Sequence, residues 1–196
     1  MPEFGKTSFE RIKTCNISIV KLFFEVVKEF DCTVIQGDRG AVEQMNYYHN
    51  GKSKLVYPLG KHNPVYEGED LKKLADIIGC DVNAIPETMP FLEHDLLLEI
   101  DANAPYSKSR AVDVIPYPVD WAFEQHVWCA FKAQNKAGGM IALHNIERWA
   151  MFIGVVKGIA SQMKIPIICG ADWDGDNQMS DQKFDDWPHF ELKEDF

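Results

Sequence analysis

Apolar side chains recur at helical spacing near the start of the chain. They fall at Ile19, Leu22, Phe23, Val26, Val27 and Phe30. Because positions three and four apart share one face of a helix, this repeat predicts an amphipathic helix over residues 16–30. Asn16 or Ser18 can cap its first turn through a side-chain oxygen. The run CTVIQG follows at once and predicts a short strand that leads into a turn.

The rest of the chain mixes further helical patterns with a few short strands. Helices are predicted at residues 41–50 and 69–78, ended by Gly51 and Gly79, and again within 86–101, 120–137 and 144–163. Strands are predicted within 109–118, 164–169 and 188–192, and the stretch LVYPLGKHNP is expected to be a loop or an irregular strand. This order favours an α+β fold with a small antiparallel sheet and flanking helices.

The net charge and the distribution of charged residues argue against a nucleic-acid partner and against a membrane span. The chain has 196 residues, a formal net charge of -10 and 46% apolar residues, which is enough for a packed core. It lacks the clustered Lys and Arg that nucleic-acid binding requires, so no nucleic-acid partner is expected. Charged residues interrupt the longest apolar stretches, so no membrane span is expected either. We expect a monomer.

The N-terminus and the cysteines bear on the compartment. The opening residues, MPEFGKTSFERIKTC, contain no apolar core of a signal peptide. The cysteines are odd in number and form no CxxC pair, which favours buried thiols in a reducing compartment. They are Cys15, Cys32, Cys80, Cys129 and Cys169. We therefore expect the protein to accumulate in a cytoplasm and to need another factor to leave it.

Three short segments carry residues suited to metal chemistry. Asp186 precedes His189 by three positions in DDWPHFEL, Asp113 lies in the apolar stretch AVDVIP, and His62 lies in GKHNP. Two imidazoles and one carboxylate suit zinc, with a fourth position left for water. Zinc lowers the pKa of such a water molecule toward ~7, and a nearby carboxylate such as that of Asp186 can then act as a base.

Each of these residues also has a plainer explanation. An ionised carboxylate in an apolar stretch needs a partner, and Arg110 or Arg39 can form a salt bridge with Asp113. A histidine in a turn, such as His62, is commonly exposed to solvent. Two residues spaced as DxxH are commonly both on the surface.

The motifs together resemble a known family of zinc peptidases. In the family, a histidine of an SxH motif precedes AxDxxP, and DxPHFEL comes later; this chain has GKHNP, AVDVIPYPVDW and DWPHFEL. The segment CTVIQGDRGAVEQMNYYHNGKSK is similar to the corresponding endolysin segment. The chain thus resembles the zinc D,D- and L,D-peptidases, which include vancomycin-resistance dipeptidases and carboxypeptidases, and most closely the phage L-alanyl-D-glutamate endolysins.

The resemblance implies roles for the candidate residues. It assigns His62, Asp113 and His189 to Zn2+, and it makes Asp186 the general base for a metal-activated water. It also gives Arg39 the role of steadying the oxyanion or the substrate carbonyl, a task suited to a fixed guanidinium.

Two further residues are weaker candidates for contact with the substrate. Gln44 follows Arg39 by five positions and can shape the site, although a core or capping role explains it equally well. Trp187 lies between the base and the last zinc ligand in sequence, where it can border the substrate groove.

Two features depart from the family pattern. Gly60 stands where the family usually has a serine, two residues before the first histidine. His62 and Asp113 are 51 positions apart, far more than in the family, which predicts a largely helical insertion at about 65–108 within a single domain spanning 1–196. Such an insertion costs little if its ends stay close. His94, inside the insertion, is a rival zinc ligand, but the sequence around His62 matches the motif better.

A second cation site is suggested by the acidic segment ADWDGDNQMSD. Its oxygen-bearing residues alternate as in a calcium-binding EF-hand loop. They are Asp172, Asp174, Asp176, Gln178 and Ser180. The fit is partial, because position six is Asn177 instead of Gly and position twelve is Lys183 instead of Glu. The segment is either a Ca2+ site, as in some phage endolysins of this type, or a solvated acidic turn.

The resemblance leads to a main hypothesis and two alternatives. The main hypothesis is a peptidoglycan endopeptidase that cuts the L-Ala–D-Glu bond of the stem peptide, held in the host cytoplasm until its release to the cell wall or periplasm for lysis by a bacteriophage. A D,D-carboxypeptidase or dipeptidase acting on D-Ala termini is the alternative within the family. A catalytically inert wall-binding or calcium-binding protein is the alternative of another class.

Overall fold

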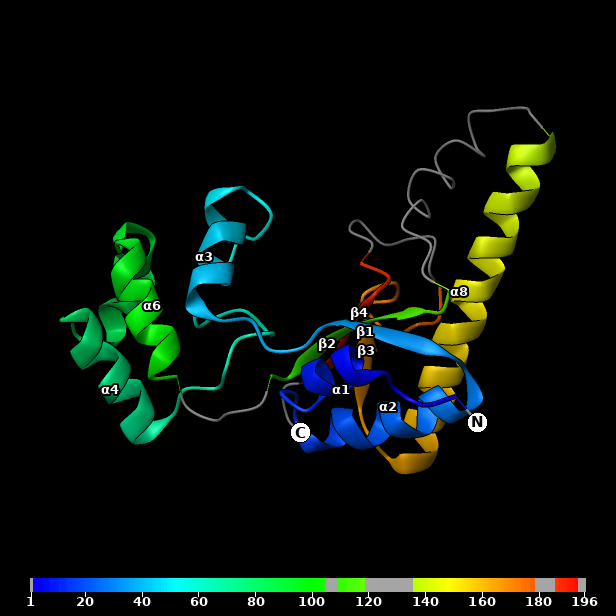
Figure 1. Cartoon of the computed structure of the whole chain (residues 1–196), viewed down its shortest axis with the longest axis horizontal. Helices are drawn as coiled ribbons and strands as arrows, with labels where there is room; N and C mark the ends of the chain where they lie inside the picture. Colours follow the sequence, from blue (N-terminus) through cyan, green and yellow to red (C-terminus); the bar gives the residue numbers. More distant parts are fainter. Residues whose placement is uncertain (1, 105–108, 119–135, 179–185, 194–196) are drawn as a thin grey trace.

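The fold, seen in a computed structural model, has two neighbouring parts (Figure 1). The structure describes residues 2–104, 109–118, 136–178 and 186–193. One part is a small sheet with helices α1, α2 and α8, and the other gathers the helices α3, α4 and α6. The α+β fold expected from the sequence is therefore confirmed.

The sheet has four strands in the order β1-β2-β4-β3, and each neighbouring pair is antiparallel. The strands span Cys32–Gln36 (β1), Ala111–Pro116 (β2), Ile167–Cys169 (β3) and His189–Leu192 (β4). All four were expected from the sequence, within a few residues at their ends. The two central strands, β2 and β4, are far apart along the chain, so the sheet brings distant segments together.

Helices α2 (Ile17–Glu29) and α8 (Lys136–Met163) pack against the sheet. The predicted apolar stripe of α2 is buried, and the Asn16 side chain accepts a hydrogen bond from the Ser18 backbone N–H as its cap. The main core joins these helices to the inward side chains of the sheet, which include Val112, Val114 and Phe190.

Two helical expectations need correction or extension. Helix α8 begins at Lys136 and runs through GG at 138–139, where a break between two helices had been expected. The predicted helix at 120–137 lies otherwise outside the described residues. Helix α1 (Lys6–Ile12), which packs on β1, was not anticipated, because its apolar positions are too few to form a clear repeat.

The segment predicted to be an insertion, at about 65–108, is largely helical where it is described. It holds α4 (Gly68–Ile78), the short turns η1 (Val82–Ala84), α5 (Ile85–Thr88) and η2 (Met89–Phe91), and α6 (His94–Ala102). These elements form a second hydrophobic cluster, which they share with α3 (Ala41–His49). Gly79 ends α4 in the left-handed conformation, as the sequence predicted.

This predicted insertion is joined to α3 by a carboxylate as well as by apolar contacts. Asp101, at the end of α6, accepts hydrogen bonds from the backbone N–H groups of Ala41 and Val42. It therefore caps the first turn of α3 from outside that helix. Gly40 allows this contact, because a Cβ there would collide with the Asp101 carboxylate.

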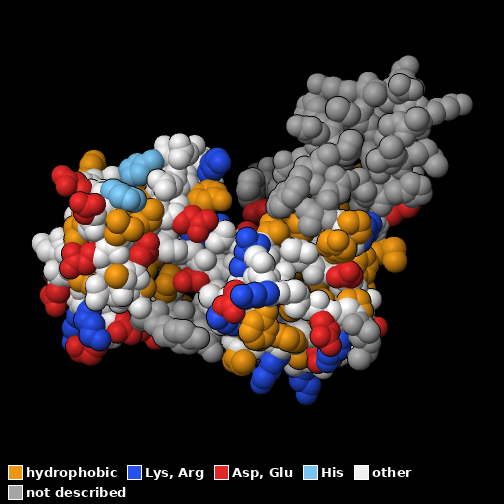
Figure 2. Space-filling view, in the orientation of Figure 1, with side chains coloured by type: hydrophobic (Ala, Val, Ile, Leu, Met, Phe, Trp, Pro, Cys, Tyr) orange, Lys and Arg blue, Asp and Glu red, His pale blue; other side chains and the backbone are white. Residues whose placement is uncertain are grey.

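Acidic side chains are spread over the outer side of this helical part (Figure 2). None of the helices among the described residues is both long and apolar enough to cross a bilayer.

Candidate metal centre

Two of the expected zinc ligands are placed by the pairing of β2 with β4. Asp113 lies directly opposite His189 in the register of these antiparallel strands. Because side chains alternate between the faces of a strand, both point away from the face that carries Val112 and Phe190 into the main core. The sheet therefore has one apolar face against helices and one face that presents polar ligands.

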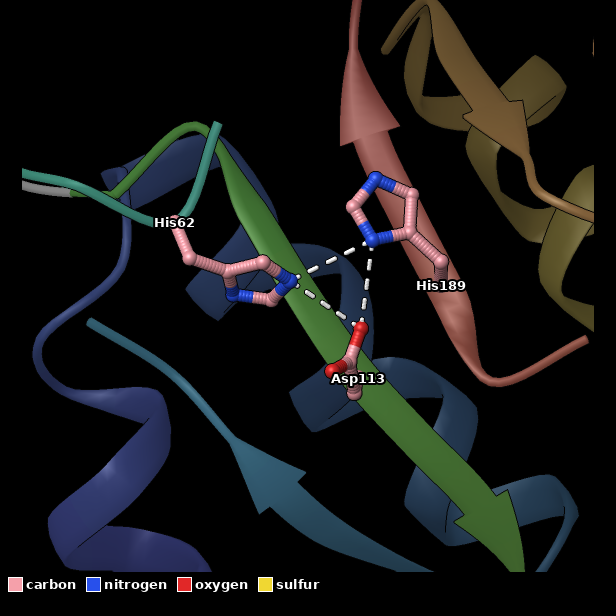
Figure 3. A group of neighbouring side chains, drawn as sticks. All are labelled: His62, Asp113 and His189. Atoms are coloured by element: carbon pink, nitrogen blue, oxygen red, sulfur yellow. Dashed lines mark hydrogen bonds and ion pairs between the residues drawn. The ribbon is translucent and has the colours of Figure 1, made fainter. Parts of the chain in front are cut away.

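The third residue, His62, comes from the loop before the insertion and is only 5% exposed. Its Nε2 lies 3.1 Å from Asp113 Oδ1 and 3.2 Å from His189 Nδ1. His189 Nδ1 lies 3.2 Å from Asp113 Oδ1 (Figure 3). Three ligand atoms from three segments thus form a nearly equilateral triangle, and the 51 positions between His62 and Asp113 do not separate them.

The outer nitrogen of each imidazole contacts a hydrogen-bond acceptor. His62 Nδ1 lies 2.8 Å from the carbonyl oxygen of Gly37, and His189 Nε2 lies 3.1 Å from Glu191 Oε2. A carbonyl can only accept, so His62 must carry its proton on Nδ1. When both rings are neutral, His62 Nε2 and His189 Nδ1 carry lone pairs that face each other and the Asp113 carboxylate. Three electron-rich atoms this close together require a cation between them.

The triangle fits zinc. Four ligands at Zn–N and Zn–O distances near 2 Å in a tetrahedron lie about 3.3 Å from one another, close to the separations found here. Hydrogen bonds from the outer nitrogens of metal-binding histidines to carbonyl or carboxylate groups are also typical of zinc sites. His62, Asp113 and His189 are therefore a candidate metal centre with a fourth position left over.

The charges of the centre are strongly coupled. Burial acts to raise the pKa of Asp113, but hydrogen bonds from His189 and His62 hold it well below its usual range. Burial acts to lower the pKa of His189, but hydrogen bonds to Asp113 and Glu191 raise it to about 9. In the absence of a metal, a proton on His189 therefore supplies the positive charge next to Asp113 that zinc would supply when bound.

Glu191 is a site residue that the sequence reasoning missed. It lies two positions after His189 on β4 and is only 7% exposed. Residues two apart on a strand share a face, so the HFE spacing was a signal that Glu191 can contact the outer nitrogen of His189. A buried carboxylate needs such a partner.

Asp186, the expected base, lies beside the centre. Its pKa is raised by burial and by the charge of Asp113, while His189, His62 and Arg39 act to lower it. Its carbonyl oxygen accepts a hydrogen bond from the His189 N–H at 3.0 Å, so a short turn ties the two residues together. A carboxylate with a raised pKa is better matched to proton transfer near neutrality.

The backbone of Asp186 depends on a close approach by Gly170. The Asp186 N–H donates to the Gly170 carbonyl at 2.9 Å, and the Gly170 N–H donates to the His189 carbonyl at 2.8 Å. A Cβ on Gly170 would collide with the Asp186 carbonyl oxygen. Only glycine allows these two segments to meet in this way.

Arg39 is held next to the metal centre by its backbone and by its side chain. Its N–H donates to the His62 carbonyl at 2.8 Å. The guanidinium lies 4.4 Å from the centre of the Tyr47 ring, and Nη1 donates to Gln44 Oε1 at 3.3 Å. It forms no salt bridge with any described carboxylate, and its Nε is buried without a hydrogen-bond partner among the described residues.

The structure also places the two weaker candidates. Gln44 is buried and holds Arg39 from one side while its amide donates to Ser53 Oγ and the Leu55 carbonyl. Trp187 packs edge-on against Trp149 and joins the main core. Among the described residues, Trp173 places its ring against the metal centre, and the ring centre lies 5.3 Å from that of His189.

The other expected features fall outside the centre. His94 is exposed at the start of α6, and the metal-binding group contains His62 instead. Asp172, Asp174 and Asp176 do bring carboxylate oxygens within 4.8 Å of one another, whereas Ser180 and Lys183 lie outside the described residues. Cys15, Cys32, Cys80 and Cys169 are free thiols, and Cys129 lies outside the described residues.

Comparisons with known proteins support the fold. No protein-family model matches the chain, and no curated protein matches its sequence. Among solved structures, that of the Serratia marcescens L-Ala D-Glu endopeptidase ChiX is similar, with a TM-score of 0.51 over 97% of this chain and 89% of that chain. The two sequences are 15% identical, so the likeness concerns the fold alone.

Proposed function

We propose that the chain is a zinc-dependent peptidoglycan endopeptidase that hydrolyses the L-Ala–D-Glu bond of the stem peptide. The observation that carries the proposal is the triangle of His62, Asp113 and His189 with acceptors behind both imidazoles. The likeness in fold to an L-Ala D-Glu endopeptidase and the sequence motifs point to the same chemistry. Host-cell lysis by a phage enzyme, released from the cytoplasm to the wall, stays a prediction.

Some site residues would bind the metal, and others would transfer a proton or stabilise negative charge. His62, Asp113 and His189 would hold zinc, which when bound polarises a carbonyl and makes water more acidic. Asp186, with its raised pKa, takes the proton from the attacking water and gives it to the leaving amine. Among the described residues, Arg39 Nε has no hydrogen-bond partner and the guanidinium pairs with no carboxylate, which suits it to the developing oxyanion.

Digestion of purified peptidoglycan fragments by the zinc-loaded protein tests the proposal. Mass analysis of the products should show a new D-Glu amino terminus and an L-Ala carboxyl terminus. Release of D-Ala instead would favour the D,D-carboxypeptidase alternative. The same preparation should bind about one equivalent of zinc, since the three ligands form one tetrahedral site. Lack of both zinc and turnover would favour the inert wall-binding alternative.

A further inference from the structure

The acidic loop at 172–178 is folded around the carboxylate of Asp172. This side chain is 1% exposed, and both of its oxygens accept from the Asn177 N–H, at 3.3 and 3.2 Å. Gly175 and Asn177 both have positive φ, which curls the loop back on itself. A carboxylate removed from water to this extent needs a positive charge beside it.

That positive charge comes from helix α8. Lys157 Nζ forms an ion pair with Asp172 and also donates to Asn177 Oδ1 at 2.7 Å. The ammonium therefore contacts the first and sixth positions of the loop, the two that already bond to each other. Burial acts to raise the pKa of Asp172, but the Lys157 contact holds it below its usual range.

The same loop touches the metal centre. Trp173 directly follows Asp172, and its ring lies 5.3 Å from the His189 ring at an angle of 37°. On the other side, the Asp172 N–H donates to the Cys169 carbonyl at 2.9 Å, at the end of β3. Because Asp172 is fixed at both its backbone and its carboxylate, the start of the Trp173 side chain is fixed as well.

We propose that Lys157 is the resident cation of the acidic loop, in the place that calcium would take, and that its ion pair with Asp172 positions Trp173 against the zinc ligand His189. Lys157 is thus a positioning residue for the metal centre. The loop is then built without calcium, and its order depends on an amine that the chain itself supplies. The inference concerns the acidic loop and the metal ligands and does not depend on which bond the protein cleaves.

The response to calcium tests the first part. Thermal unfolding of the zinc-loaded protein should be unchanged by millimolar calcium, measured against magnesium at equal ionic strength. In Lys157→Met the carboxylates lose their cation, so calcium should raise Tm by roughly 5 °C at about a hundredfold excess over its Kd. Lys157→Arg should behave as the parent does. Lys28→Met, which removes the exposed ion pair with Glu25, is the matched control and should gain no response to calcium.

Quenching of tryptophan fluorescence tests the second part. Cobalt bound at the metal centre should quench tryptophan emission more strongly in the parent than in Trp173→Phe. The difference in quenching between the two proteins measures how close the Trp173 ring lies to His189. Lys157→Met should lose most of this difference in the absence of calcium and regain it when calcium is added. A loop that is merely destabilised would lose the difference without regaining it.

Several outcomes would overturn the proposal. Calcium that stabilises the parent as much as Lys157→Met would show that the loop is a calcium site from which Lys157 is readily displaced. Equal cobalt quenching in the parent and Lys157→Met would show that Trp173 does not depend on the ion pair. Neither readout involves peptidoglycan, so failure here is distinct from failure of the proposed peptidase activity.

Discussion

Asp113 and His189 face each other across the antiparallel strands β2 and β4, and their ligand atoms are 3.2 Å apart. Strand register therefore sets most of the metal centre before any ion binds. A slip of one residue in either strand would turn its ligand toward the apolar core, where Val112 and Phe190 now pack. The sheet thus fixes two of the three ligands, and the loop that carries His62 supplies the third.

Substitutions at His189 and Asp186 should separate metal binding from catalysis. His189→Ala removes a ligand and should abolish both stoichiometric zinc and turnover. Asp186→Ala should keep zinc, because Asp186 is not in the triangle, and should lower kcat by about 10²–10⁴ through loss of the base. Zinc analysis and fragment digestion on the same samples measure both. Exposed Asp76→Ala is the control, and full activity of Asp186→Ala would remove the base assignment.

Glu191 should control zinc affinity through the ring orientation of His189. Glu191→Ala leaves Nε2 without its buried acceptor, so zinc affinity should fall by about 10–100-fold. Glu191→Gln keeps an acceptor oxygen at the same position and should lose less. Competition with a chromophoric chelator measures the affinities, with exposed Glu25→Ala as the reference. An unchanged affinity for Glu191→Ala would mean that the contact does not orient the ligand.

Two residues of the metal triangle, Asp113 and His189, lie in motifs that are local in the sequence. AVDVIP and PHFEL each combine alternating apolar residues with one ligand, which is the pattern of a strand that has one face in the core. What brings His62 to them is the packing of a loop held by the Gly37 carbonyl, and no local pattern encodes that contact. Only the resemblance to a family connected His62 to the other two.

The contacts that the sequence did not predict are mostly between segments far apart in the chain. Asp101, at the end of α6, caps α3, and Lys157 reaches the acidic loop from helix α8. A cap supplied by a distant residue leaves no signature beside the helix that it caps. Similarly, the local sequence around Trp173 and Trp187 does not indicate that the Trp173 ring lies against His189 and that Trp187 packs against the core.

Gly170 should be intolerant of a side chain, in contrast to a glycine on α8. Gly170→Ala forces the Asp186 carbonyl to move, which should lower the free energy of unfolding by about 1–3 kcal/mol and reduce turnover by displacing the base. Gly158 is exposed on α8 with open space around it, so Gly158→Ala should instead add about 0.5–1 kcal/mol. Chemical denaturation and fragment digestion compare the pair. A neutral Gly170→Ala would contradict the close approach.

Asp101 should link the insertion to Arg39. Asp101→Ala removes the cap of α3, which carries Gln44, so the free energy of unfolding should fall by about 1 kcal/mol. Gln44 then holds the Arg39 guanidinium less firmly, and kcat should fall while the zinc content stays the same. Asp95→Ala, an exposed substitution on the same helix α6, is the control. If kcat stays unchanged while stability falls, the insertion does not act through α3.

Zinc affinity should depend steeply on pH because zinc and a proton compete for His189. In the metal-free protein the pKa of His189 is about 9, since its hydrogen bonds to Asp113 and Glu191 outweigh the effect of burial. Below that pH zinc must displace a proton, so affinity should rise about tenfold per pH unit up to about 9 and then level off. Calorimetry in buffers of different ionisation enthalpy should detect one proton released per zinc at pH 7.5.

The free energy of unfolding of the metal-free protein should fall as the pH rises, because it depends on the proton bound to His189. The pKa of His189 is raised on folding from 6.5 to about 9, so its contribution to stability is complete below pH 6.5 and is lost as pH rises through 9. Zinc-loaded protein should not show this loss, because the metal replaces the proton. Urea unfolding of both forms between pH 6 and 9.5 measures the difference. Parallel pH profiles for the two forms would show that His189 does not exchange a proton for the metal.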